Sequence, residues 1–340
     1  MKPLPAIFLS VSIAAQTPEP ASALRVMTDE AEAVLAILAL RQQGKPPTEA
    51  HWQALFATEG YRRLKEREHA MKRPFEDESF KAFVQSAALL NRASALRDTL
   101  GRWRQVDLQA SAHKVSAYLP AGGRIRATVY FVIKPRKNSF VFDLAKDPAV
   151  FMYLDPTVTP GKLENTVAHE LHHVGLQGTM NRLSSWKGES DTPRDLARTY
   201  IGAFGEGFAM LAAAGAPEVH PHAVSPEAER ARWDEDMGRF AQNLRGVDAF
   251  LQEVASGRLG PAAAQEKAAA TFWGDAQGAW YTVGHRMAVL IETTFGRGRL
   301  LACMEDLSLL LPTYNEAARL NNQKSKESLP LWSEALLSAL

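Results

Sequence analysis

One short block of strand-like sequence interrupts a chain that otherwise has helical periodicity, and this block most limits the folds available. It contains three β-branched and aromatic runs, RIRATVYFVIKP, SFVFDL and VFMYLD, separated by the turn signals PRKN and AKDPA. A small sheet of three or four strands is therefore expected between residues 115 and 155. Because the flanking sequence is helical, the expected fold class is α+β and predominantly helical.

The sequence on either side of this block has apolar residues at three-to-four spacing. In its first helical run, TDEAEAVLAILALRQQG, Asp29 is placed as a cap with Glu32 three residues on, and Gly44 marks a stop. Residues 24–114 are predicted to form a helical N-terminal lobe. Residues 115–340 are predicted to contain the sheet and then only helices. The histidines of the lobe are interpreted as ordinary surface or boundary residues: His51, His69 and His113.

Composition indicates a globular protein without a nucleic-acid partner. The 340-residue chain has a formal net charge of +1, and 46% of its residues are hydrophobic. That is enough to bury a substantial core in one large domain or two smaller ones. Nucleic-acid binding would call for a basic face. Cys303 is the only cysteine, so no internal disulfide can form, and its apolar surroundings predict a buried side chain.

The N-terminus has the order of a secretory signal peptide over residues 1–23. A lysine precedes a short apolar run, which is followed by a polar, Pro-rich stretch with cleavage options after Ala14, Ala15 or Ala23. The run is too short to span a bilayer, and no later segment is long and apolar enough, so no transmembrane segment is expected. The protein is expected to be exported to the periplasm or the medium. A disordered N-terminal tail is the alternative.

The stretch TVAHELHHVG contains the pattern H-E-x-x-H, formed by His169, Glu170 and His173. On a helix over residues 161–177 the two imidazoles share one face and can converge on one metal ion. Glu170 is turned roughly 100° away, where its carboxylate can take a proton from a water on the metal. His172 adjoins His173 and is expected to be a non-ligand. The alternative is a polar helix face whose histidines are solvated.

A catalytic zinc needs a third protein ligand and an open fourth position. The extended pattern with a third histidine fails, because Leu176 and Thr179 occupy its glycine and histidine positions. His220 and His222 lie in a Pro-rich loop, PEVHPHAVSP, and are expected to be solvated. The downstream candidates are Glu189, Asp191, Asp195, Glu206, His220 and His222.

Glu206 is the favoured third ligand. It is the one carboxylate inside a helix predicted over residues 192–214, on a stripe of mostly small residues. A buried carboxylate there would be costly unless it were paired or bound to a metal. Asp195 instead forms a capping pair with Thr192, and Gly215 can end the helix. The alternative is that Glu206 is exposed.

Two later segments bear on the site. Tyr281 and His285 lie four apart in GAWYTVGHRMAVLIETTFG, and a donor at either position could stabilise the oxyanion of a tetrahedral intermediate. The alternatives are that Tyr281 packs in the core and that His285 lies at the surface. The stretch SPEAERARWDEDMGRFAQNLRGVDAFLQEV, capped by Ser225, predicts one long amphipathic helix beside the catalytic core or over its cleft.

HELHH followed further along by GEGFA resembles the gluzincin branch of zinc metallopeptidases, and most closely bacterial zinc-dependent peptidases of otherwise unknown function. ATEGYRRLKERE and WYTVGHRMA are also similar to that group. The resemblance implies a zincin-like catalytic core with one zinc per chain, His169, His173 and Glu206 as ligands, and Glu170 as base. Some gluzincins orient a metal histidine with an aspartate four residues after the ligand glutamate. Here Met210 occupies that position, so the group that orients the histidines is unidentified.

The expected function is zinc-dependent hydrolysis of peptide bonds in a peptide or protein substrate, with Glu170 activating a zinc-bound water. An extended edge strand beside the metal helix would hold the substrate backbone. Two alternatives stay open: a non-catalytic metal-binding or peptide-binding helical module, and a metal-dependent hydrolase of a non-peptide substrate. The sequence does not specify an oligomeric state.

Overall fold

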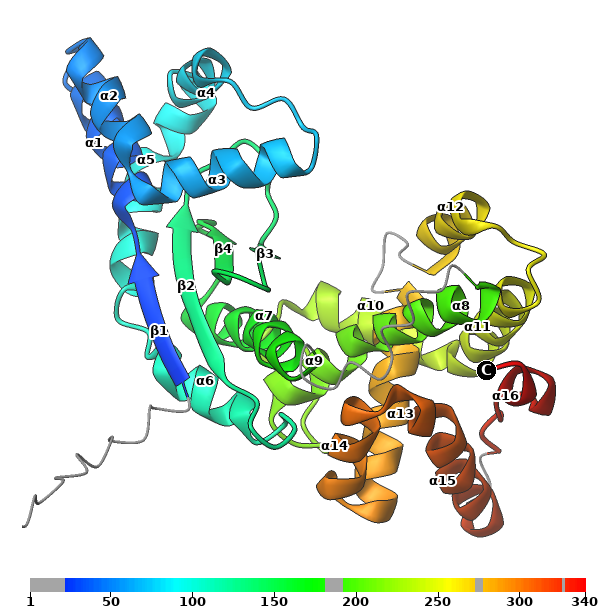
Figure 1. Ribbon diagram of the computed structural model, residues 1–340. Coiled ribbons are helices and arrows are strands. Elements are labelled where there is room, and N and C mark those ends of the chain that lie inside the picture. The colour runs from blue at the N-terminus through cyan, green and yellow to red at the C-terminus, as the bar shows by residue number, and fades with distance from the viewer. Residues whose placement is uncertain (1–21, 181–191, 273–277, 326–327) are drawn as a thin grey trace, which may run out of the picture.

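The computed structural model describes residues 22–180, 192–272, 278–325 and 328–340 (Figure 1). Most of the chain is helical, and the strands form one mixed sheet, so the predicted α+β, predominantly helical class is confirmed. The strands are β1 (Ser22–Met27), β2 (Ile125–Val132), β3 (Phe140–Phe142) and β4 (Ala149–Tyr153). The helices before the metal helix are α1 (Asp29–Gln42), α2 (Glu49–Ala57), α3 (Glu59–Ala70), α4 (Asp77–Val84), α5 (Ala87–Trp103) and α6 (Leu108–Ser116). The later helices are α7 (Pro160–Met180), α8 (Pro193–Ile201), η2 (Gly202–Phe204), α9 (Gly205–Ala214), α10 (Glu227–Gly238), α11 (Phe240–Ala255), α12 (Pro261–Phe272), α13 (Gly278–Phe295), α14 (Arg297–Glu305), η3 (Leu307–Leu309), α15 (Leu310–Lys324) and α16 (Glu334–Ala339).

The sheet has the strand order β1-β2-β4-β3. β1, β2 and β4 are parallel, and the short β3 pairs antiparallel with β4 at the outer edge. Every residue of β4 is buried, as is almost all of β2, which is why both were recognisable as continuous apolar runs. The three strands predicted between residues 115 and 155 are confirmed.

The first strand, β1, was not predicted, because residues 24–114 were expected to be helical throughout. β1 pairs with β2 along its whole length, with Val26 opposite Val129. It is a six-residue edge strand in which no residue is buried. Its extended form therefore depends on a partner far along the chain rather than on a local pattern.

Two predictions for the N-terminal lobe hold, and a third does not. Gly44, with φ of 71°, follows the end of α1, and the lobe histidines lie at or near the surface. Asp29, however, does not cap its own helix. The cap position of α1 belongs to Thr28, and the Asp29 carboxylate accepts hydrogen bonds from the backbone N–H groups of Glu59 (2.7 Å) and Gly60 (3.2 Å) at the start of α3. Asp29 therefore ties two helices of the lobe together.

Helix α7 lies against the sheet and contacts β2, α6 and α9, as Figure 1 shows at the centre of the molecule. One side of α7 is apolar and packs in the core, since Leu163, Val167 and Leu171 are fully buried. The histidines lie on another face of the same helix, so sheet packing fixes the direction in which they point.

The helix predicted over residues 192–214 is interrupted. Thr192 caps α8, with its Oγ1 accepting from the Asp195 N–H at 3.2 Å, and Gly215 ends α9 in the left-handed region with φ of 92°, as expected. Between them the three residues of η2 form a tighter turn. It begins at Gly202 and is followed by Gly205, and glycine has weak helix propensity. The interruption places Glu206 in the first turn of α9.

The predicted long helix that begins near Ser225 is two helices, α10 and α11, which meet after Gly238. Ser225 does not cap α10. Its hydroxyl accepts a hydrogen bond from the Lys162 ammonium at 2.7 Å, and the same ammonium donates to Glu229 at 2.7 Å. These bonds tie α10 to α7, the helix that carries H-E-x-x-H.

Helices α9 and α13 approach each other backbone to backbone. A Cβ atom added at Gly207 would come within 2.1 Å of the backbone nitrogen of His285, and one added at Gly284 within 2.7 Å of the carbonyl oxygen of Phe204. The close packing of these two helices thus depends on glycines at positions 207 and 284. Cys303 is buried, as predicted. Within the described ranges, no helix has the length and apolar character needed to cross a bilayer.

Candidate metal centre

Three side chains from two helices converge at one point. His169 and His173 lie one helical turn apart on α7, and Glu206 reaches them from the start of α9. Nε2 of His169 lies 3.1 Å from Oε2 of Glu206, and Nε2 of His173 lies 3.3 Å from the same oxygen. The two imidazole Nε2 atoms are 3.1 Å apart. The structure thus brings together the three residues that the sequence suggested.

The spacing and chemistry of these atoms fit a zinc ion. Tetrahedral zinc with nitrogen and oxygen ligands at about 2.0–2.1 Å requires neighbouring ligand atoms roughly 3.3 Å apart. Two imidazoles and one carboxylate are also the donor set of several catalytic zinc sites. The side chains of His169, His173 and Glu206 keep 13%, 19% and 20% of their surface exposed. The site is therefore partly open, as a fourth position for water or substrate requires.

Electrostatics within the cluster favour a charged carboxylate. Burial opposes the charged form of Glu206, but its hydrogen bonds with His169 and His173 outweigh this and hold the pKa of its carboxyl far below the usual range. Burial likewise opposes protonation of His173, whereas the bond to Glu206 raises the pKa of that imidazole above its ordinary value. A divalent cation would replace the imidazole protons as the partner of this carboxylate.

Tyr281 on α13 faces the cluster. Its ring stacks on that of His169, with ring centres 6.1 Å apart and planes 16° apart. Burial, together with the neighbouring Glu206 carboxylate to which the phenol is hydrogen bonded, raises the pKa of Tyr281 far above its ordinary value. The phenol therefore stays protonated and remains a hydrogen-bond donor at any physiological pH.

Glu170 follows His169 on α7 and is half-buried. Its negative charge contributes to raising the pKa of both His173 and Tyr281, which places its carboxylate near the cluster. It is not among the three converging residues. This is the arrangement expected of a group that acts on a water beside a metal rather than on the metal itself.

His172 lies outside the cluster and is fully buried, so the alternative of a helix face with solvated histidines is wrong for this residue. Its Nε2 lies 3.3 Å from the carbonyl oxygen of Tyr118, and burial lowers the pKa of the imidazole to about 3. The contact anchors α7 to the chain that follows α6. No motif indicated it, because a backbone carbonyl leaves no signature in a sequence.

The group that orients the metal histidines is still unidentified. Nδ1 of His169 is buried and has no hydrogen-bond partner among the described residues. Met210, at the position where some gluzincins carry an aspartate, is itself buried. The stacked ring of Tyr281 and the packing of α7 against the sheet are what hold the His169 ring in place.

The prediction that His222 is solvated is wrong. His222 is 3% exposed, its ring centre lies 5.2 Å from that of Trp233 on α10, and its Nδ1 is 3.1 Å from Ser225 Oγ. Burial lowers the pKa of its imidazole to about 4. The sequence could not show this, because the covering tryptophan belongs to a helix whose direction is set by tertiary packing. His220, partly exposed, lies 3.0 Å from Asp234.

His285 is buried and its ring also lies against Trp233, with ring centres 5.2 Å apart. The alternative of a surface position is therefore wrong. Neither ring nitrogen has a partner among the described residues, and burial lowers the pKa of the imidazole to about 3. This placement favours a packing role for His285 over the role of oxyanion donor.

The remaining candidates do not join the cluster. Asp195 serves as the capping partner of Thr192. Glu189 and Asp191 lie outside the described residues. Among the described residues, the cluster of His169, His173 and Glu206 is the one group of three or more metal-binding side chains with convergent ligand atoms.

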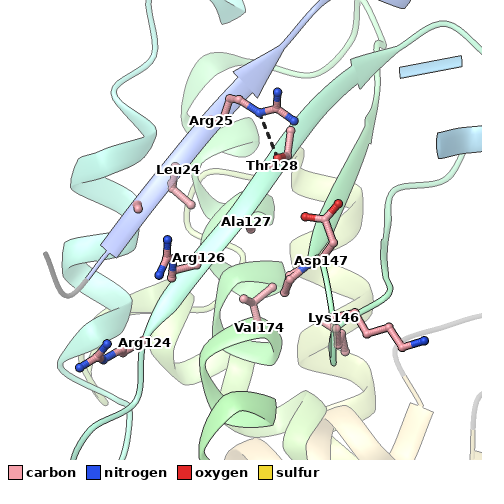
Figure 2. Close-up of a pocket in the computed structure, with 12 residues that line it drawn as sticks. Leu24, Arg25, Arg124, Arg126, Ala127, Thr128, Lys146, Asp147 and Val174 are labelled. Carbon is pink, nitrogen blue, oxygen red and sulfur yellow. Dashed lines mark hydrogen bonds between the residues drawn. The ribbon is translucent and has the colours of Figure 1, made fainter. Parts of the chain in front are cut away.

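A separate hollow of about 610 Å³ runs along β1 and β2 (Figure 2). Four basic side chains line it, and the Nε of one of them, Arg25, donates to Thr128 Oγ1 at 3.3 Å. Helix α7 contributes Val174 to its lining. Because Val174 is turned about 100° from His173 on the helix, this hollow lies on the sheet side of α7 and is distinct from the cluster. The other basic residues are Arg124, Arg126 and Lys146.

Fold and site together define a class: a predominantly helical α+β protein in which two histidines of one helix and a glutamate of another form a donor set suited to zinc. The family follows from comparison with known sequences. The profile of the family described as "Putative zinc dependent peptidase (DUF5700)" matches residues 52–323, most of the chain, and the protein belongs to that family. The resemblance to zinc-dependent peptidases is thus confirmed. Neither the curated proteins nor the solved structures include a match.

Proposed function

We propose that this protein is a zinc peptidase in which His169, His173 and Glu206 hold one zinc ion and Glu170 is the general base. The observation that carries the proposal is the convergence of three ligand atoms, 3.1–3.3 Å apart, from two separate helices. Membership of a family of zinc-dependent peptidases supports the same reaction class.

The chain's own residues supply the proton transfers of peptide hydrolysis. Bound zinc would supply Lewis acidity, which polarises a carbonyl and makes water a stronger acid. Glu170 takes the proton of the attacking water as the water oxygen bonds to the carbonyl carbon, and then delivers it to the leaving nitrogen. The protonated Tyr281 phenol donates a hydrogen bond to the oxyanion that forms on the substrate.

We propose that the edge strand β3 binds the backbone of the substrate. It ends the strand order of the sheet, and α7 contacts both β3 and β4. One edge of β3 pairs with β4. An extended peptide can pair with the other edge, which is the usual way in which a strand holds a substrate backbone.

We also propose that the protein is exported, with cleavage after Ala14 or Ala15. Cleavage after Ala23 would remove Ser22 and Ala23, which pair with Ile125 and Arg126 of β2. N-terminal sequencing of secreted protein checks this. A start at Ala15 or Gln16 supports it, whereas an intact Met1 on all of the protein would exclude export by a cleaved signal.

Metal analysis and a matched pair of variants test the proposed function. The purified parent should contain about one zinc per chain and cleave members of a peptide library. Glu170→Gln should keep the zinc and lose the cleavage, whereas His173→Ala should lose the zinc. Zinc without cleavage in the parent would favour the non-catalytic module, and hydrolysis restricted to non-peptide esters or amides would favour the other hydrolase.

A further inference from the structure

A second small cavity, of about 130 Å³, lies in the N-terminal lobe. It is bounded by α3, by α4 and the segment leading into it, and by the chain that leaves the end of β2. None of the residues assigned above to the metal centre lines it. Its lining combines apolar side chains with an excess of positive charge.

Lys134 is the unusual member of the lining, because it is a lysine with only 3% of its surface exposed. Its ammonium donates to the carbonyl oxygen of Arg136 at 2.5 Å and to Oδ1 of Asn138 at 2.7 Å. In the described part of the chain, no carboxylate lies within ion-pair distance of it. Its Nζ also lies 5.2 Å from the ring centre of Phe140 and 5.7 Å from that of Tyr153. A buried ammonium is normally paired with a carboxylate, and none of these four neighbours is one.

The carboxylates nearest to Lys134 are either paired with another residue or uncharged. Glu68, which lines the cavity, pairs with the buried guanidinium of Arg67 at 2.6 Å, while Arg73 approaches it only to 3.9 Å. Glu30 lies deeper and is fully buried, and burial raises the pKa of its carboxyl to about 8, so it is mostly uncharged at neutral pH. With Arg67 and Glu68 cancelling, the cavity is left with the positive charges of Arg73, Lys134 and Arg136.

The apolar side chains of the lining are buried. Leu64, Phe75 and Phe80 are all buried, and the rings of Phe75 and Phe80 lie 5.5 Å apart. A dry cavity of about 150 Å³ lined by such residues is large enough for a benzene ring. The cavity observed therefore has room for about one aromatic ring or one branched acyl chain.

We propose that this cavity binds a small carboxylate with an apolar tail, its carboxylate at Lys134 and Arg73 and its tail against the rings of Phe75 and Phe80. Two sources share this chemistry: a free short-chain or aryl acid, and the C-terminal residue of a peptide. In either case the ligand supplies the counter-ion that the buried lysine lacks.

The protonation of Lys134 gives this binding a pH signature. Burial lowers the pKa of its ammonium to about 8, and a bound carboxylate would raise it again. Ligand binding then takes up a proton at and above pH 8, so affinity falls as the pH rises above that value. Other charged groups that face Lys134 are Glu30, Arg67, Glu68 and Arg136.

Calorimetric titration of the full chain with phenylacetate tests the proposal. Binding is expected with a dissociation constant of about 1 mM or tighter, since each heavy atom of so small a ligand contributes substantially. Phenylacetamide, of the same shape without the charge, should bind at least about tenfold more weakly. N-acetyl-phenylalanine is the third ligand titrated, and it distinguishes the two sources. Tighter binding than that of phenylacetate indicates the C-terminal residue of a peptide, and weaker binding indicates a free acid.

Variants locate the site. Lys134→Met and Arg73→Gln should each weaken phenylacetate binding about tenfold or more, as expected for loss of a charge-assisted hydrogen bond. Lys137→Gln, in the same loop as Arg136 but outside the cavity lining, is the matched control and should leave affinity unchanged. If Lys134→Met does not fold, Arg73→Gln and the pH dependence still decide the question.

Three results would overturn the proposal: no phenylacetate binding at about 10 mM, ten times the weakest constant expected; equal affinity for the amide; or equal loss in Lys137→Gln and Arg73→Gln. Affinity that is constant across pH 7–10 would also contradict the role given to Lys134. Each outcome is independent of the metal centre, because the titrations need neither zinc nor catalysis.

Discussion

At the scale of single residues, His169 and His173 need only a helix in order to meet, because four residues bring the chain about once around. Glu206 needs a second helix at the right distance, and its position is set by η2 and by the close packing of α9 on α13. The resulting carboxylate is charged and half-enclosed, with imidazoles as its nearest partners. A divalent cation is the ligand that best satisfies all three groups.

The role of Glu206 can be tested by Glu206→Gln, which keeps the size of the side chain but removes its charge. Zinc affinity, measured by competition with a chelator, should fall at least about 100-fold, because a neutral amide is a poor zinc ligand. Glu164→Gln, an exposed position on α7, should bind zinc as the parent does. An affinity within about threefold of the parent for Glu206→Gln would exclude this residue as a ligand.

Tyr281→Phe separates the proposed oxyanion role from simple packing. The phenyl ring can still stack on His169, so zinc content and the KM for a peptide substrate should change little. The kcat should fall about 100- to 1000-fold, as when one oxyanion donor is removed. Equal kcat values for the variant and the parent would show that the hydroxyl is not used in catalysis.

At this scale, the sequence predicts those contacts that form between residues a few positions apart in the chain. The H-E-x-x-H pair and the capping pair of Thr192 and Asp195 are local, and both lie as expected. Glu206 was predicted as the third ligand because it is the one carboxylate on a stripe of mostly small residues. His222 and His285 were misjudged, since their burial under Trp233 depends on how α10 packs against α13.

At the scale of elements, the distance between α9 and α13 decides whether Glu206 and Tyr281 can face the same point. Gly207 and Gly284 allow the two backbones to touch. The strands β2 and β4 were recognisable because they are apolar throughout, whereas β1 was not, because pairing and not composition makes it extended. The interruption of the helix at η2 was not predicted, because glycine lowers helix propensity but does not determine where a helix ends.

Adding a methyl group where α9 meets α13 tests whether the two backbones are in contact. Gly207→Ala should lower the free energy of unfolding by about 2–4 kcal/mol, because its Cβ would meet backbone and not a movable side chain. Gly205→Ala is the matched control, since no atom lies within 4 Å of its added Cβ. Denaturant unfolding compares the two. Similar stability in both variants would contradict the close contact of α9 and α13.

At the scale of the whole molecule, buried histidines make the fold acid-sensitive. His222 and His285 have pKa values of about 4 and 3 in the folded protein, below the ordinary value of 6.5. At pH values between these pKa values and 6.5, the unfolded chain binds more protons than the folded protein does. Burial of the two neutral imidazoles therefore costs no stability above pH 6.5, and the free energy of unfolding decreases as the pH falls through this range. Each pKa unit corresponds to about 1.4 kcal/mol.

His285→Leu should therefore move the midpoint of acid unfolding to lower pH, because no buried imidazole remains to be protonated at that position. Stability at pH 8 should be equal or higher, since both ring nitrogens lack partners among the described residues. The exposed His113→Gln should leave the acid midpoint unchanged. Unfolding followed by circular dichroism across pH 3–8 measures both, and an unchanged midpoint in His285→Leu would contradict the burial cost assigned to this residue.

The zinc ion of the proposed peptidase would be bound by two imidazoles of α7 and one carboxylate of α9. X-ray absorption at the zinc edge of the purified parent tests it most directly. The spectrum should show two imidazole nitrogens and one carboxylate oxygen at about 2.0–2.1 Å from zinc, and the carboxylate contribution should be lost in Glu206→Gln. A sulfur ligand, a third imidazole, or a spectrum unchanged by Glu206→Gln would contradict it.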